Sequence, residues 1–420
     1  MMERWRRNRR RILTLAAAGA AGAATAYAVY KWWYADGGSS EPDKGSEDEG
    51  QRASGSGSGG AAGSRRQEAG VLIDPQGRAG TAQMDAEAHL QHHFDSIQDI
   101  ADSTTLPSLL PALSRALAQA ADVDGPLERL RQAKEGRAPL SPADKLAAWE
   151  ELKVAAFVRA AGAAWLLPLL DLFVRVQLNI LGRHLYLESA VEGSGMARPA
   201  GLPKLSAPSQ ERFLSFAEFL AQQGAAELLA LMRAAAEARL AGVALQETVA
   251  AGQVQQLLAG ISEEFAERLA AAATGGTGGG SGGGGGSPGR GWARFLLPPP
   301  AEVHASLAPR APDNRAMLLG ADALLVDARV VEELVAEAEA VAAGDEFAAA
   351  VAAGSQAALA AAATQLAAGM GAARLPLAKA VPLVAAVGGD LLAVPSLRPV
   401  LAQLEPVRSL SARVYGCCYL

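Results

Sequence analysis

The stretch from Ser141 to Glu188 is the longest well-patterned segment of the sequence, and it constrains the fold more than any other. Ser141, followed by a proline and then by Asp144, is a typical helix start, because the serine hydroxyl can accept a hydrogen bond from a free backbone N–H. Apolar residues then recur at helical spacing, at Leu146, Trp149, Leu152, Ala156, Phe157, Trp165 and Leu166. We therefore expect a long helix with one face packed into a core.

Pro168 lies inside this pattern and is predicted to kink the helix or to split it in two. The part that follows, residues 169–187, is apolar nearly all round, which is typical of a helix at the centre of a bundle. It nevertheless carries Asp171, Arg175 and Asn179, and buried polar side chains need partners. We expect Arg175 to pair with Asp171 one turn earlier, and Asn179 to bond to Arg175 or to a neighbouring helix, as a structural network.

Composition places the whole chain in the all-α class. Half of its 420 residues are hydrophobic, alanine dominates, and no useful stretch alternates with period two. We predict an elongated multi-helix bundle with an N-terminal transmembrane helix and disordered linkers.

The net charge of -6 argues against nucleic-acid binding. The two cysteines, adjacent at Cys417 and Cys418, provide no disulfide framework.

The N-terminus has the pattern of a membrane anchor. Residues 1–11 form a basic tail with six arginines, and 12–34 follow as an apolar segment that ends in Lys31, Trp32, Trp33 and Tyr34. About 20 apolar residues span a bilayer, and aromatic residues mark its interface. A secretory signal peptide or an organelle transit peptide has a similar order of residues and stays open as an alternative.

Two low-complexity segments flank or interrupt the predicted body, which we place at 81–420. Residues 35–80 are rich in Gly, Ser, Glu and Asp and are predicted to be a disordered linker. Residues 274–291 are nearly pure glycine, but no Gly-Lys-Ser/Thr ending follows, so we expect a loop rather than a phosphate site. The remaining patterns predict helices at 84–100, 105–120, 209–241, 245–273, 315–341, 346–370 and 375–392, with an extended piece at 292–300.

The sequence carries few groups for chemistry. His89, His92 and His93 lie on one predicted helix, and histidines four apart can ligate a metal. They lack an HExxH pattern and a cysteine partner, so we expect a solvated helix face and no metal. A serine–histidine–acid set and a dinucleotide fingerprint are absent from the sequence. We therefore expect a binding protein without a cofactor rather than an enzyme.

Several segments resemble the peroxisomal biogenesis factor 3 (peroxin 3) family, in the family's order. These are HLQHHFDSIQDIADSTTLPSLLPALSRAL at 89–117, DKLAAWEELK and FVRVQLNILGRHLYLE within 141–188, and LPLAKAVPLV at 375–384. The resemblance is good over 91–127 and 141–190 and patchy from there to Val387. Arg183, directly after Gly182, departs from the family, which often has a second small residue there, and this predicts a looser helix contact.

The resemblance implies a docking factor in the peroxisomal membrane for the cytosolic receptor, of the peroxin 19 type, that delivers newly made membrane proteins. It implies a single-pass anchor, with the bulk of the chain in the cytosol, and capture of the receptor's N-terminal helix. The six arginines before the span favour the opposite orientation by the positive-inside rule.

The alternative function is an organelle-imported soluble helical protein whose N-terminal targeting peptide is cleaved.

The candidate binding surface lies at the start of the long predicted helix. Lys145, Trp149, Leu152 and Ala156 share one helix face, which suits an amphipathic partner helix. The pattern alone favours Trp149 as a core residue. The resemblance implies that Trp149 is the receptor-binding tryptophan, with Lys145 and Leu152 as its neighbours and Leu140 and Leu185 as wall residues.

Overall fold

The computed structural model describes residues 89–194, 204–274, 290–307, 321–393 and 397–416. Over these ranges the chain is helical, apart from loops and two strands of two residues each, which confirms the all-α class. The predicted basic tail at 1–11, the anchor at 12–34 and the linker at 35–80 lie outside the described residues. Most of the glycine-rich segment 274–291 does too.

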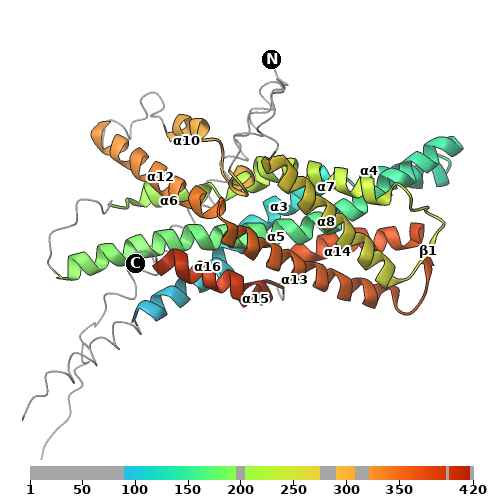
Figure 1. Cartoon of the computed structure of the whole chain (residues 1–420). Coiled ribbons are helices and arrows are strands. Elements are labelled where there is room, and N and C mark those ends of the chain that lie inside the picture. The colour runs from blue at the N-terminus through green and yellow to red at the C-terminus, as the bar shows by residue number, and fades with distance from the viewer. Residues whose placement is uncertain (1–88, 195–203, 275–289, 308–320, 394–396, 417–420) are drawn as a thin grey trace, which may run out of the picture.

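One helix, α5 (Pro142–Ser194), runs through the bundle for 53 residues, or about 80 Å at 1.5 Å per residue. Figure 1 shows it lengthwise, with the other helices along its sides. It starts where the sequence predicts: the Asp144 amide donates to Ser141 Oγ at 3.1 Å. Every residue from 160 to 183 is buried, so the middle of α5 is the centre of the core.

Pro168 does not split α5, which continues as a single helix on both sides of it, so the expected division is wrong. The reason lies in the packing around the proline. Gly354 of α13 (Asp345–Met370) faces the ring so closely that a Cβ at Gly354 would lie 2.5 Å from Pro168 Cβ. Neighbouring helices thus hold α5 together although proline removes one hydrogen bond of its ladder.

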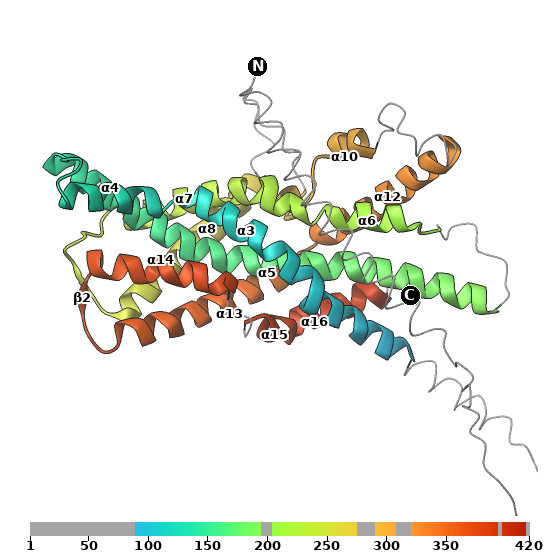
Figure 2. The same cartoon turned by 180° about the vertical axis from the view of Figure 1, so that it is seen from behind.

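The other helices surround α5 (Figure 1). On one side lie α3 (Leu106–Ala120), α4 (Asp124–Lys134), α7 (Ala225–Leu240) and α8 (Ala251–Thr274). On another lie α13, α14 (Leu377–Ala393), α15 (Leu397–Ala402) and α16 (Glu405–Gly416). The remainder are the short α9 (Ala293–Leu296) and α10 (Pro300–Leu307), with α6 (Ala207–Ser215) and α12 (Ala321–Ala342). In Figure 2 the stretch from residue 89 through the π-helical turn η1 (Ala101–Thr105) and α3 crosses α5 diagonally.

Several predicted helices are divided or shortened in the structure. The single helix expected at 209–241 is in fact α6, a π-helical turn η2 (Leu220–Gly224) and α7. At Gly224, a Cβ would lie only 1.8 Å from the Phe295 carbonyl oxygen, so a close backbone approach fixes this bend. The piece expected to be extended at 292–300 contains the short helix α9.

A small antiparallel ladder joins two distant loops. Strand β1 (Thr248–Val249) precedes α8, and strand β2 (Leu375–Pro376) precedes α14, with Thr248 opposite Pro376 and Val249 opposite Leu375. These pairs explain why the helices expected at 245–273 and 375–392 begin later than predicted, at residues 251 and 377.

Polar residues in the middle of α5 bind the helix that precedes α3. Arg175 Nε donates to Asp171 Oδ2 at 3.2 Å, and its guanidinium also pairs with Asp102. Gln98 accepts from Arg175 Nη1 at 3.0 Å and donates to Asn179 Oδ1 at 2.8 Å. Burial raises the pKa of Asp171, while the charge of Arg175 opposes that rise. The network therefore fixes the position of the 89–105 segment on α5.

Arg183 does not loosen the packing near the end of α5, contrary to the expectation from the sequence. It is buried, donates to the Val414 carbonyl of α16 at 2.9 Å and pairs with Glu337 of α12. The adjacent Gly182 packs tightly, because a Cβ there would lie 2.0 Å from the Ile97 side chain. Arg183 thus ties two further helices to α5.

His93 also meets α16. Its Nδ1 lies 2.5 Å from the Tyr415 hydroxyl, and the imidazole is buried. Burial, and to a smaller extent the charges of His89 and His92, lower the pKa of His93 to about 4. Within the described ranges, no three or more His, Cys, Asp or Glu side chains are grouped so that they could hold a metal ion.

Two described helices are long and apolar enough to cross a membrane by length and composition alone. The apolar window of α5 is 94% buried inside the bundle, which identifies it as a core helix, and that of α13 is 39% buried. This property therefore does not assign either helix to a bilayer.

Replacing Arg175 with methionine should lower the free energy of unfolding by about 3 to 5 kcal/mol, because Asp171 is left buried without its partner. Urea titration would measure the loss. Arg329→Met is the matched control, since Arg329 also pairs with a glutamate but its side chain is 81% exposed. The control should lose no more than about 0.5 kcal/mol, and equal losses for the two variants would contradict this account.

Acid should destabilise the fold through His93. The unfolded imidazole takes up a proton near its ordinary pKa of about 6.5, whereas the folded one does so only near 4. Protons therefore favour the unfolded chain between these values, and the free energy of unfolding should fall as the pH drops from about 6.5 to about 4. In urea titrations across this range, His93→Gln should reduce the slope, whereas His92→Gln, which removes only a minor neighbouring charge at an exposed position, should reduce it much less.

A candidate partner-binding pocket at the start of α5

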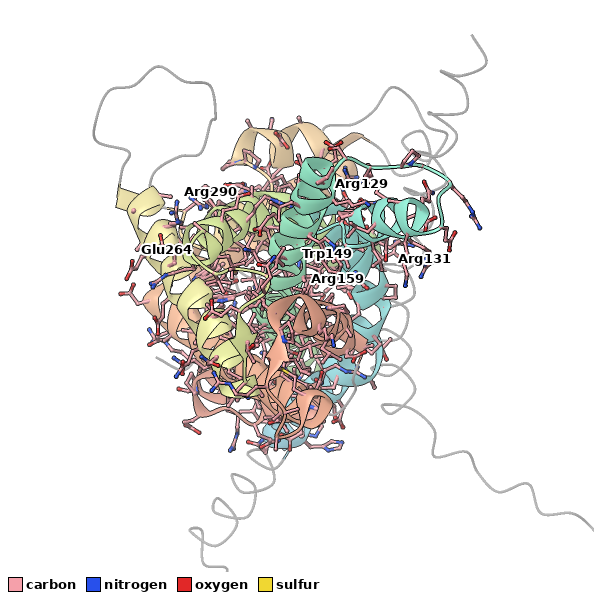
Figure 3. The ribbon with its side chains drawn as sticks, turned by 90° about the vertical axis from the view of Figure 1, so that its right-hand side faces the viewer. Arg129, Arg131, Trp149, Arg159, Glu264 and Arg290 are labelled. Atoms are coloured by element: carbon pink, nitrogen blue, oxygen red, sulfur yellow. The ribbon has the colours of Figure 1, made fainter. Side chains whose placement is uncertain are left out.

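A surface pocket of about 410 Å³ lies where α5 begins. Its lining residues come from four segments: Leu146 and Trp149 of α5, Leu245 and Gln246 of the loop after α7, Pro376 of β2 and Ala378 of α14. Figure 3 looks onto this end of the bundle, with Trp149 labelled on α5. The pocket is mainly apolar and open, which suits an apolar side chain on the surface of another protein.

The α5 side of the pocket consists of one exposed and one half-buried apolar residue. Leu146 has 54% of its surface exposed, an unusual value for leucine in this fold, and Trp149 is half-buried. Because they are three residues apart, they lie next to each other on the helix surface. Lys145, one turn before Trp149, is exposed and forms no ion pair with the described residues.

The opposite side of the pocket, which we call the far wall, consists of Leu245, Gln246 and Pro376. The amide of Ala378 donates to the Leu245 carbonyl at 3.0 Å, and that of Leu377 donates to the Glu247 carbonyl at 2.8 Å. Together with the β1–β2 ladder, these bonds join the loop before α8 to the loop before α14. The far wall is therefore one connected unit made from two distant parts of the chain.

Lys153 links α5 to the end of α7, just before this unit. Its ammonium donates to the carbonyls of Val243 at 2.8 Å and Leu240 at 3.3 Å, at the end of α7, and lies 2.6 Å from the Glu150 carboxylate. Lys153 is only 2% exposed, so it is a buried cation that is satisfied by partners on two elements. The sequence pattern did not single out this residue.

The structure separates the five residues proposed from the sequence. Trp149 lines the pocket, and Lys145 lies exposed one helical turn before it. Leu152 is 1% exposed, so it packs in the core beneath the pocket rather than at its surface. Leu140 is half-buried in the segment before α5. Leu185 is 36 residues beyond Trp149 on the same helix, about 54 Å away, and cannot line the same pocket.

Sequence reasoning did not single out Leu146 or the far wall for this role. Leu146 follows Lys145 and precedes Trp149 by three residues, so its place beside Trp149 could have been inferred. Pro376 and Ala378 belong to the segment LPLAKAVPLV, which carries part of the family resemblance. No sequence pattern points to Leu245 and Gln246, because only the tertiary fold brings the loop after α7 to this end of α5.

A comparison with known protein families matches a range that includes most of this pocket. The Peroxin-3 family profile matches residues 134–375, which include all of α5 and reach the first residue of β2. The chain is 35% identical over 179 residues to Peroxisome biogenesis protein 3-2 of Arabidopsis thaliana, covering 43% of this chain and 48% of that protein. It is 32% identical over 174 residues to Peroxisomal biogenesis factor 3 of Homo sapiens, covering 41% of this chain and 43% of that protein. The chain thus spans about half the length of the curated relatives it matches.

Proposed function

The chain belongs to the Peroxin-3 family, and on that premise we propose that it docks the cytosolic receptor, of the peroxin 19 type, that delivers newly made peroxisomal membrane proteins. The observation that supports this proposal most directly is the pocket beside Trp149. An apolar hollow next to an accessible tryptophan and an unpaired lysine fits the apolar ridge of an amphipathic helix that carries an acidic residue at its edge. The proposed role is binding, with no enzymatic step and no cofactor.

The location that goes with this role is the peroxisomal membrane. Residues 12–34 would cross the bilayer once, and the helical bundle would face the cytosol, where the receptor circulates. The basic tail at 1–11 would then lie on the peroxisomal side, although the positive-inside rule favours the reverse. We base the orientation on the family, because a receptor from the cytosol can reach only a pocket on that side.

Replacing Trp149 with alanine should weaken binding of the receptor's N-terminal helix by about 2 to 4 kcal/mol, the scale of a buried hot spot. Isothermal titration against a peptide of that helix would measure the change. Circular dichroism would show that the variant stays folded. Wild-type affinity in a folded variant would rule out this pocket as the docking site.

Leu146 allows a sharper test, because the chain offers a matched leucine elsewhere. Leu146 and Leu127 are 54% and 38% exposed, and only Leu146 lines the pocket. Leu146→Ala should weaken receptor binding by about 1 kcal/mol or more, whereas Leu127→Ala on α4 should leave the affinity unchanged. Neither change should alter stability by more than about 1 kcal/mol, since both side chains are exposed at the surface rather than packed in the core. Equal affinities for the two variants would argue against the proposal.

The alternative function, an imported soluble protein with a cleaved targeting peptide, makes a different prediction for the N-terminus. An anchored chain keeps its first residues and stays in the membrane pellet after carbonate extraction. N-terminal sequencing of the mature protein together with that extraction would decide between them. A mature chain that starts after residue 34 or so and is released by carbonate would favour the alternative.

A further inference from the structure

The far wall of the pocket depends on attachments outside its own residues. Leu245 and Gln246 belong to the loop between α7 and α8, and Pro376 to the short strand before α14. The bonds from the amides of Ala378 and Leu377 hold these segments to each other. Arg374 adds hydrogen bonds to the Thr248 carbonyl at 3.3 Å and to Gln253 at 3.2 Å. These contacts fix the wall internally but do not set its distance from Trp149.

Lys153 supplies a polar contact between the pocket side of α5 and the end of α7, which leads directly into that wall. An ammonium group has three donors, and here three acceptors surround it: the Leu240 carbonyl, the Val243 carbonyl and the Glu150 carboxylate. The two carbonyls belong to the end of α7 and the turn after it, where helix carbonyls carry partial negative charge, and the Leu240 carbonyl also accepts from the Val243 amide at 3.1 Å. Val243 is only two residues before the wall residue Leu245.

The position of Lys153 relative to Trp149 makes this contact relevant to the pocket. The two residues are four apart on α5 and therefore neighbours on its surface. Lys153 is 2% exposed and does not line the pocket, so a partner would not touch it. Figure 3 shows this end of α5 beside the segments that form the wall.

We propose that Lys153 is a positioning residue for partner binding. It holds the far wall at a fixed distance from Trp149, and the pocket therefore keeps a single shape. This inference rests on the proposed function for the identity of the partner. A pocket that already has its bound shape pays a smaller free-energy cost of ordering when the partner binds. Loss of the Lys153 contact should therefore weaken binding, although it removes no contact to the partner.

The test compares Lys153→Met with Arg183→Met in the full-length chain. Arg183 is the matched control, because it too is a buried cation that donates to a backbone carbonyl and pairs with a glutamate. It lies 30 residues further along α5, about 45 Å from Lys153. Both changes should destabilise the fold, so stability alone does not distinguish them. Glu150→Gln is a milder variant in case Lys153→Met fails to fold, since the Glu150 side chain is 45% exposed.

Two readouts are needed. Hydrogen exchange of the amides of Leu377 and Ala378, which the carbonyls of Glu247 and Leu245 protect, should be faster in Lys153→Met and unchanged in Arg183→Met. Affinity for a peptide with the N-terminal helix of a peroxin 19 type receptor should fall roughly tenfold in Lys153→Met. It should fall about twofold to threefold in Glu150→Gln, which keeps both carbonyl bonds. Arg183→Met should bind as the wild type does.

The outcomes separate this inference from the function on which it rests. Unchanged exchange in Lys153→Met, or faster exchange with unchanged affinity, would overturn the positioning role. An equal loss of affinity in Arg183→Met would also overturn it, because the effect would then follow stability alone. Trp149→Ala should weaken binding by about 30-fold or more, as expected from the loss of a hot spot, while leaving exchange at the wall unchanged. If Trp149→Ala binds normally, the proposed function fails, and the inference fails with it.

Discussion

Burial of α5 is the constraint on which the rest of the described structure depends. A helix that is apolar on every side is stable in water only if other elements surround it. Its backbone bonds are satisfied internally, but its few polar side chains need acceptors on its neighbours. Three buried cationic side chains of α5 find such acceptors on different neighbouring elements. Lys153 binds the end of α7, Arg175 binds the segment that leads into α3, and Arg183 binds α12 and α16. Each contact sets where one neighbour lies along the helix.

The middle and the start of α5 have different surroundings. From residue 160 to 183 every residue of α5 is buried, and near residue 182 tight packing leaves no space beside the glycine. At the start of α5 the neighbours leave one side partly uncovered, and there Leu146 and Trp149 face a hollow. An exposed leucine is costly to solvate and is stabilised when a partner covers it. The same helix therefore provides both the core and the proposed docking surface.

The family match and the pocket overlap in the chain. The profile covers residues 134–375, which include the pocket residues Leu146, Trp149, Leu245 and Gln246, and the pocket also uses Pro376 and Ala378, just beyond it. The lysine and tryptophan at the beginning of α5 lie in this shared part. The proposal that this surface takes an amphipathic helix follows from its shape and charge. The proposed identity of that helix rests on the family alone.

The sequence by itself determined the all-α class, the start of α5 at Ser141, the pairing of Arg175 with Asp171, and the place of Trp149 near that start. Each of these depends on residues within a turn or two of one another, where helical spacing fixes geometry. Tertiary structure alone decided that α5 passes Pro168 without a break, that Leu152 is buried and Trp149 is not, and that Leu185 lies far from the pocket. It also placed Leu245 and Pro376 opposite Trp149. Those outcomes depend on which distant segment covers each side of α5, and no local pattern encodes the contacts of residues about 100 or more positions apart.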